Sequence, residues 1–307
     1  MDSGKVKKWI LRIVTTTLVT VSVIVLLFSI LFYSWRSNIN ERIQPAGSVI
    51  NIDNGFVEYH FDERGGDEVV FYSHGTPANF LAPVPNSFAD LGYSMLSVAR
   101  PGYFNTMLST GRTPANQADL YAKVIERLEL DSVIMWGVSG GGPAAMEFAL
   151  NYPEKCRALI LQASYLTQTD PNYSSGWLKE NLESEFGYWL RLNTIKIFAN
   201  TEQEKENIEE YLKSIVPYPL IKNGLENDRI QLAAYIPPNL SEIHCPILVI
   251  HGTNDKLTNF HELSELISLH PDINNLMIEG GDHYSVLYSG DELIKNEIES
   301  FLQTSLN

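Results

Sequence analysis

Cysteine is scarce in this chain, which has two among its 307 residues. Two cysteines are too few for a disulfide framework, and the spacing of Cys156 and Cys245 fits no zinc-binding pattern. Each stands just before an apolar run, where cysteine packs as a small hydrophobic side chain. We interpret both as buried, unpaired thiols, with a single disulfide between them as the alternative.

Basic side chains are also few, which limits the kinds of partner. There are 22 Lys and Arg against 37 Asp and Glu, a formal net charge of −15. This balance excludes nucleic acid as a partner. The first 36 residues differ from the rest, because they hold five basic side chains and one acidic one. A basic amino-terminal segment therefore precedes an acidic body.

Repeats and low-complexity tracts are absent from the body, which argues against a solenoid or a disordered chain. Hydrophobic residues make up 44% and charged residues 19%, the composition of a packed globular protein. We expect residues 49–307 to form one domain with an insertion.

Charge is missing from residues 13–35, a stretch that reaches about 35 Å as a helix, against about 30 Å for the hydrocarbon core of a bilayer. Lysines and an arginine crowd its first end, and such residues favour the cytoplasmic side: Lys5, Lys7, Lys8 and Arg12. We expect residues 1–36 to hold a cytoplasmic stub and a single-pass anchor in the cell membrane, and residues 37–48 to link it to a non-cytoplasmic body. A cleaved signal peptide is the alternative, but the apolar stretch is longer than usual and no A-x-A-like site follows.

Short apolar runs recur through the body and are typical of buried parallel strands, at residues 69–72, 95–98, 133–136, 159–161, 247–250 and 276–278. Residues 116–129 and 143–150 have helical patterns and fit as crossovers between such strands. The turn residues 53–55 separate two apolar runs and predict an antiparallel hairpin. The pattern indicates a mostly parallel sheet flanked by helices.

Ser139 stands in Gly137-Val138-Ser139-Gly140-Gly141, between a predicted strand and a predicted helix. A serine on such a sharp turn is exposed for nucleophilic attack, and the strained turn requires small residues two positions away. The helix start directs amides toward an oxyanion at Ser139, and the Gly140 N–H is the natural donor. We predict that Ser139 is a nucleophile.

A serine nucleophile needs a base, and the base needs an acid that fixes its tautomer. Asp255 follows the run 247–250 and His283 follows the run 276–278, so both are expected at the carboxyl edge of the sheet. The order Ser139, Asp255, His283 fits a catalytic triad in an α/β sheet. Asp282 is the alternative acid, but it adjoins His283 in sequence and is expected to point elsewhere.

From about Val49 onward the chain resembles the α/β-hydrolase family. Four motifs carry the resemblance: His74-Gly75-Thr76-Pro77, Arg100-Pro101-Gly102-Tyr103, the run from Gly137 to Pro143, and the Asp255 and His283 loops. The resemblance implies an α/β-hydrolase fold with a helical cap insertion, and the Thr76 N–H as the second oxyanion donor. We interpret His74 and His251 separately as structural, with rings that bond to a nearby loop and do not join the chemistry. Ala99 and Phe104-Asn105 depart from the pattern of many relatives, which affects the inferred substrate but not the triad.

The insertion is expected at residues 165–238, where the rhythm of strands stops. Because it leaves and rejoins the sheet near the carboxyl edge, we expect it to cover Ser139 and form the substrate pocket. It is rich in aromatic residues that suit an apolar acyl or aryl group: Trp177, Phe186, Tyr188 and Trp189. The alternative is that these rings pack the insertion onto the body.

These features predict a membrane-anchored serine hydrolase that cleaves a small or lipid-like carboxylic ester through an acyl-enzyme, with no cofactor or metal. Its partners are a small-molecule acyl substrate and, through residues 13–35, a membrane. The chain also resembles proline iminopeptidases in part, but Thr76 and Gly140 stand where those enzymes have glycine and tryptophan. Because this resemblance is partial, an aminopeptidase is the alternative, in which Glu183 or Glu185 binds the amine of the substrate. Two further alternatives are an enzyme that transfers the acyl group to an acceptor other than water and a non-catalytic, membrane-tethered binding protein.

Overall fold

A computed structural model describes residues 3–40, 47–63, 66–81, 88, 91–166, 184–197, 199, 201–215, 217–258, 260–288 and 292–306. The chain divides into two compact units, Met1–Gln44 and Pro45–Asn307.

The first unit is a single long helix, α1 (Ser3–Asn40). Its segment Gly4–Asn38 contains an 18-residue window with a mean hydropathy of 2.5 and is long and apolar enough to cross a membrane. The uncharged residues 13–35 lie within this segment. The helix is therefore a candidate transmembrane helix.

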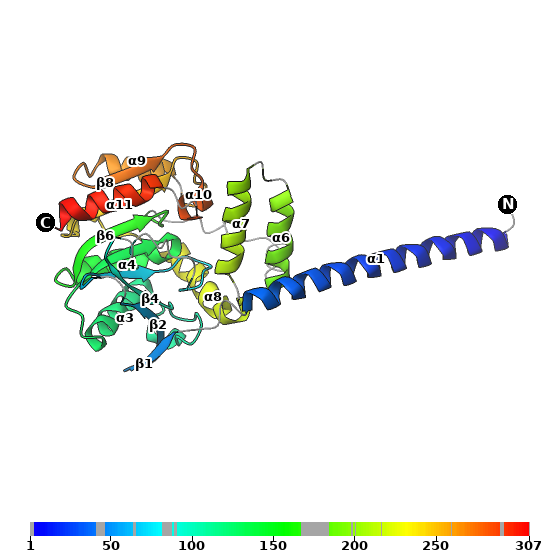
Figure 1. Ribbon diagram of the computed structural model, residues 1–307, viewed down its shortest axis with the longest axis horizontal. Coiled ribbons are helices and arrows are strands. Elements are labelled where there is room, and N and C mark those ends of the chain that lie inside the picture. The colour runs from blue at the N-terminus through cyan, green and yellow to red at the C-terminus, as the bar shows by residue number, and fades with distance from the viewer. Residues whose placement is uncertain are drawn as a thin grey trace. The chain divides into compact units, whose positions relative to one another are not determined.

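The second unit is built on an eight-stranded sheet with the order β1-β2-β4-β3-β5-β6-β7-β8 (Figure 1). The strands are β1 (Ser48–Ile52), β2 (Gly55–Asp62), β3 (Val69–Ser73), β4 (Ser94–Val98), β5 (Val133–Val138), β6 (Cys156–Gln162), β7 (Ile247–Gly252) and β8 (Asn274–Ile278). From β4 to β8 every neighbouring pair is parallel, whereas β2 is antiparallel to both β1 and β4. The predicted hairpin and six apolar strands are all present, and the mostly parallel sheet is confirmed.

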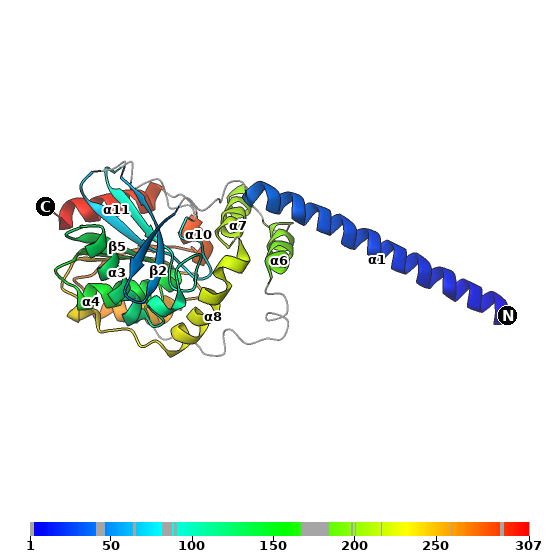
Figure 2. The same ribbon diagram turned by 90° about the horizontal axis from the view of Figure 1, so that it is seen from below.

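Helices cover both faces of the sheet, which is why the parallel strands are apolar on both sides. Phe71 and Met135 face a core that includes residues of α3 (Pro114–Arg127), α4 (Gly142–Asn151) and α9 (Phe260–Ser268). Val70 and Ile134, their sequence neighbours, face the opposite core, with α10 (His283–Tyr288) and α11 (Glu292–Ser305). Figure 2 shows α11 on one side of the strands and α3 and α4 on the other.

The two cysteines are unbonded, with Cys156 buried and Cys245 half-buried. Their Sγ atoms lie 3.6 Å apart, because β6 and β7 are neighbours in the sheet. Both thiols are unpaired, but the expectation that both are buried is right for Cys156 alone.

Between β6 and β7 the described residues form α6 (Glu185–Ile197), α7 (Glu202–Ser214) and α8 (Tyr218–Ala234), the helical insertion of this fold. In Figures 1 and 2 these helices lie at one end of the sheet, where α7 is beside α10. Trp177 and Glu183, named in the sequence analysis, fall outside the described residues. The boundaries 165–238 for a separate cap stay a prediction.

Candidate active site

All the residues that the sequence analysis places in the site follow the carboxyl ends of strands. Thr76 follows β3, Ser139 follows β5, Asp255 follows β7 and His283 follows β8. These strands run in the same direction, so their carboxyl ends meet at one edge of the sheet, where open α/β sheets place their ligands. The fold therefore brings together residues that lie more than 200 positions apart in the chain.

Ser139 occupies a tight turn between β5 and α4, with φ of 48°. This left-handed conformation is unfavourable for a residue with a side chain, and it places the hydroxyl at the top of the turn. A Cβ atom at Gly137 would lie 2.7 Å from Ala145 Cβ, and one at Gly141 would overlap the carbonyl oxygen of Ser73. The turn thus requires glycine at both positions, for the reason that the sequence predicts.

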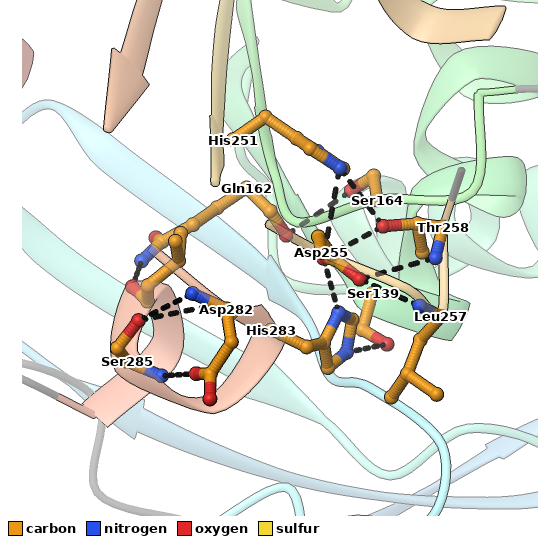
Figure 3. A network of polar contacts seen from close by, with 11 residues as sticks. Ser139, Gln162, Ser164, His251, Asp255, Leu257, Thr258, Asp282, His283 and Ser285 are labelled. Atoms are coloured by element: carbon orange, nitrogen blue, oxygen red, sulfur yellow. Dashed lines mark hydrogen bonds and ion pairs between the residues drawn. The ribbon is translucent and has the colours of Figure 1, made fainter. Parts of the chain in front are cut away.

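A chain of hydrogen bonds runs from Ser139 through His283 to Asp255 (Figure 3). Ser139 Oγ lies 3.0 Å from His283 Nε2, and His283 Nδ1 lies 2.7 Å from Asp255 Oδ2. All three side chains are buried. With His283 neutral, Nδ1 donates to the carboxylate, and Nε2 is left to accept the serine proton. This arrangement is suited to activating the hydroxyl.

Asp255 is held as a carboxylate by several donors. Its Oδ1 accepts hydrogen bonds from the backbone amides of Leu257 and Thr258 at 2.8 and 3.2 Å, and its Oδ2 accepts one from the Thr258 hydroxyl at 2.8 Å. Burial by itself raises the pKa of Asp255, but the bond and charge of His283 and the Thr258 hydroxyl outweigh it and bring the pKa well below its ordinary value. The acid therefore remains ionised beside the imidazole.

Thr258 joins a further histidine to this group. Its hydroxyl gives its one proton to Asp255, so His251 Nε2 is the donor in the 3.0 Å contact with Thr258 Oγ1. Burial lowers the pKa of His251 to about 4, and the ring is neutral near pH 7. His251 contacts Thr258, the residue that holds Asp255, rather than Ser139. This contact is in keeping with a structural role for His251. The sequence analysis missed Thr258, although a loop aspartate commonly bonds to the backbone two residues on, as Asp255 does to Leu257, and so marks a local turn.

Asp282, the alternative acid, faces away from the imidazole. Its Oδ1 accepts the Ser285 backbone N–H at 2.8 Å at the start of α10, and Figure 3 shows its carboxylate beside Ser285. Asp282 thus satisfies an amide of the first helical turn.

Thr76 and Gly140, the two expected oxyanion donors, lie side by side. A Cβ atom at Gly140 would be 3.3 Å from the Thr76 backbone nitrogen and 2.7 Å from Thr76 Cβ. A Cβ atom at Gly75 would be 3.2 Å from Ser139 Cβ, so the loop after β3 packs directly against the serine turn. The Thr76 amide therefore lies beside Gly140, the residue that follows Ser139, where both amides are candidates to stabilise an oxyanion.

His74 holds this loop in place. The backbone N–H of Arg100 donates to His74 Nε2 at 3.0 Å, and His74 Nδ1 donates to the Gly75 carbonyl at 2.9 Å. Burial and the Arg100 charge lower the pKa of His74 well below its ordinary value, so it stays neutral. The structural role that the sequence analysis gives His74 agrees with these contacts.

The helical insertion reaches the site from two sides. The Tyr211 ring of α7 lies 4.9 Å from that of Tyr284, the residue after His283. Asp228 of α8 bonds to the Thr76 hydroxyl. The sequence analysis missed Asp228, because nothing in the local pattern distinguishes it from the other acidic residues of the insertion.

The expected pocket aromatics pack largely with one another. Tyr188 lies 5.7 Å from the Tyr218 ring, and Phe186 lies 5.8 Å from the Trp189 ring. Of these, only Phe186 is exposed. Glu185 is buried in the first turn of α6. Within the part of the chain that the structure describes, no group of three His, Cys, Asp or Glu side chains could hold a metal ion.

Known proteins share this architecture. A solved α/β-hydrolase fold protein from Nakamurella multipartita is similar with a TM-score of 0.70 and 22% identity, over 84% of this chain and 99% of that one. A solved membrane phospholipase A is similar with a TM-score of 0.60 and 16% identity, over 98% of this chain and 99% of that one. The curated relative YcgS, an uncharacterized hydrolase of Bacillus subtilis, is 26% identical over 236 residues, which are 68% of this chain and 82% of the relative.

A family model described as serine aminopeptidase, S33, matches residues 106–284, more than half of the chain. The matched range includes Ser139, Asp255 and His283. The fold predicted from the sequence is thus confirmed, and the chain belongs to the serine aminopeptidase, S33, family of α/β hydrolases.

Proposed function

We propose that this hydrolase is a membrane-anchored enzyme that cleaves a carboxylic ester through an acyl-enzyme on Ser139. The observation that carries the proposal is the chain of hydrogen bonds from Ser139 Oγ through His283 to Asp255, on a strained turn beside two candidate oxyanion donors. Such an arrangement serves to make a hydroxyl nucleophilic, and it fits a binding protein poorly.

In the first half of the reaction, Ser139 Oγ attacks the carbonyl carbon while His283 Nε2 takes the serine proton. The Asp255 carboxylate stabilises the resulting imidazolium through Nδ1. The carbonyl oxygen becomes an oxyanion, which accepts hydrogen bonds from the Thr76 and Gly140 amides. Collapse of this intermediate breaks the bond to the leaving alcohol, and His283 gives that alcohol the proton.

In the second half, water takes the place of the alcohol. His283 removes a proton from water, and the hydroxide attacks the acyl carbon on Ser139. The same two amides hold the second oxyanion. The acid product leaves and the proton returns to Ser139 Oγ, so no cofactor is consumed.

An ester is favoured over a peptide by the residues around the nucleophile. Thr76 and Gly140 replace the glycine and tryptophan that are typical of the proline iminopeptidases that the chain resembles. An aminopeptidase is the second candidate, and the description of the matching family model favours it. In that case Glu185, buried at the start of α6, is a candidate to bind the substrate's amine.

The substrate's acyl group is proposed to be apolar, because the helical insertion that reaches the site is rich in aromatic side chains. Each methylene that enters such a pocket contributes up to about 0.8 kcal/mol. Longer acyl chains should therefore be better substrates.

α1 is proposed to anchor the enzyme in the cell membrane, with the body on the non-cytoplasmic side. Its length, the mean hydropathy of 2.5 in its 18-residue window and the basic residues before its apolar stretch support this topology. The similarity to the membrane phospholipase A covers 98% of the chain and so extends into this helix.

The proposal is tested by assaying the full-length chain in detergent micelles with p-nitrophenyl esters from acetyl to octanoyl and with aminoacyl naphthylamides. We expect kcat/KM to rise with acyl length and the naphthylamides to react poorly. Ser139→Ala should abolish turnover without unfolding the protein, since it removes only a hydroxyl. A steady fall from acetyl to octanoyl, or a strict need for a free amine, would favour the aminopeptidase.

A further inference from the structure

A buried polar cluster lies beneath the loop that carries Thr76, and the proposed chemistry does not use it. Its centre is an ion pair between Arg100, after β4, and Asp228, on α8. Both side chains are almost completely buried, at 1% and 2% exposure. Charged side chains this deeply buried are costly unless other groups complete their hydrogen bonds.

Asp228 collects donors from two different loops on one oxygen. Its Oδ2 accepts the Thr76 hydroxyl at 2.5 Å and the Tyr103 hydroxyl at 2.6 Å, besides the Arg100 guanidinium. Thr76 is the residue whose amide is the proposed oxyanion donor. The helical insertion thus contacts the oxyanion loop through this carboxylate.

Arg100 completes the attachment from the other side. Its Nη1 donates to Thr76 Oγ1 at 3.1 Å and to the His74 carbonyl at 3.2 Å. The Thr76 hydroxyl therefore accepts from Arg100 and donates to Asp228, which fixes the direction of its side chain. Since Thr76 is tied at its side chain, the position of its backbone amide depends on the ion pair.

The part of α8 just before Asp228 is itself packed closely against the loop that follows β4. The Gly224 N–H donates to the Gly102 carbonyl at 2.9 Å, and the Phe104 N–H donates to the Leu220 carbonyl at 2.6 Å. A Cβ atom at Gly102 would lie 2.7 Å from the Gly224 nitrogen, so the two backbones touch. A helix held this closely is a rigid support for a loop.

We propose that Asp228 is a positioning residue, which aims the Thr76 amide at the oxyanion by holding the Thr76 hydroxyl. The inference rests on the proposed function, because it needs an oxyanion at Ser139. An oxyanion donor acts only if it is already aimed when charge develops, and a displacement of about 1 Å is costly. The insertion, in this account, serves the chemical step as well as substrate binding.

The test separates the Thr76 hydroxyl from the rest of the cluster. Thr76→Val removes the hydroxyl and leaves Asp228 paired with Arg100 and Tyr103, so the variant should fold. Thr76→Ser keeps the hydroxyl. The matched control is Asn227→Ala, which removes a 2.8 Å bond from α8 to the carbonyl of Arg112, a residue outside the loop of Thr76.

We expect Thr76→Val to lower kcat roughly 10- to 100-fold with KM changed less than about threefold. Inhibition by an alkyl trifluoromethyl ketone, whose adduct with serine carries an oxyanion, should weaken by a similar factor. Thr76→Ser and Asn227→Ala should keep kcat within about threefold. Asp228→Asn should lower kcat at least as much as Thr76→Val, with circular dichroism to verify its fold.

The outcomes distinguish this inference from the proposed function. Wild-type kcat in Thr76→Val, or an equal loss in Thr76→Ser or Asn227→Ala, would overturn the role of Asp228 while Ser139 chemistry stands. Activity that survives Ser139→Ala would instead overturn the proposed function.

Discussion

Of the two aspartates considered for the acid of the triad, Asp282 adjoins His283 in the sequence and Asp255 lies 28 residues away, yet Asp255 contacts the ring of His283. The difference is one of loop geometry. Asp255 comes from the neighbouring strand end and faces Nδ1, whereas Asp282 turns back to the Ser285 amide. Proximity in the chain is therefore a poor guide to the acid of a triad, and the order of strands is a better one.

Replacement of each aspartate by asparagine tests this assignment. Asp255→Asn should lower kcat by about 10³- to 10⁴-fold, because the amide no longer holds the imidazole in the required tautomer. Asp282→Asn should change kcat less than about threefold, since asparagine caps a helix as well as aspartate does. The comparison uses steady-state kinetics on the full-length chain. Similar losses in both variants would contradict the assignment of Asp255.

The burial of His251 leads to a separate prediction about how the free energy of unfolding depends on pH. Its pKa is lowered to about 4 in the folded protein, against 6.5 for an ordinary histidine, because it is buried. Between pH 7.5 and pH 5, His251 becomes protonated in the unfolded chain but stays neutral in the folded protein. This difference lowers the free energy of unfolding by about 2 kcal/mol over that range. Asp255 has a lowered pKa in the folded protein. Its protonation therefore reduces the free energy of unfolding only at lower pH, below its pKa of about 4 in the unfolded chain.

Urea unfolding at pH 7.5 and 5 measures this effect. His251→Gln, which keeps a donor for Thr258, should reduce the stability lost between the two pH values by about 2 kcal/mol. His261→Gln is the control, because His261 is 80% exposed. An unchanged pH dependence in His251→Gln would show that His251 is not held neutral by the fold.

The strands and crossover helices could be predicted because the residue types of each element reflect how that element is buried in the fold. β5 is buried along its whole length, so it reads as an apolar run, and Gly137 and Gly141 mark the turn that follows. Asp53, Asn54 and Gly55 likewise mark the hairpin between β1 and β2. These are local signals, and parallel pairing then places Ser139, Asp255 and His283 at one edge.

The polar partners across long separations could not be predicted in the same way. Arg100 and Asp228 pair over 128 residues, and neither residue's neighbours indicate the other. Thr258 is a similar case, because its link to His251 depends on how the loop after β7 folds back on the strand. The sequence thus predicts the candidate reacting groups, and the fold shows which residues hold them in place.

The orientation of α1 depends on charge at its ends. With basic residues before the apolar segment, we expect the amino terminus in the cytoplasm and the body outside. Protease added to intact cells should remove the body of the full-length chain, while a cytoplasmic control protein stays whole. Digestion that occurs only after permeabilisation would reverse the proposed topology.

The whole molecule consists of a candidate transmembrane helix and a hydrolase domain. The helical insertion of this domain contacts the site at two places. α7 packs on the residue after His283, and α8 bonds to the hydroxyl of Thr76, whose amide is the proposed oxyanion donor. The insertion therefore contacts the neighbour of the proposed base on one side and the proposed oxyanion loop on the other. In this account, a substrate that alters how the insertion packs affects kcat as well as KM.

The central claim is that Ser139 is an activated nucleophile, and covalent capture tests it most directly. The full-length enzyme in detergent is treated with an alkyl fluorophosphonate, which reacts with activated serine hydroxyls, and its intact mass and ester hydrolysis are measured together. We predict one adduct per chain, located on Ser139 by peptide mass spectrometry, with activity lost in proportion and no adduct on Ser139→Ala. An active preparation that takes up no phosphonate, or equal labelling of Ser139→Ala, would contradict the account.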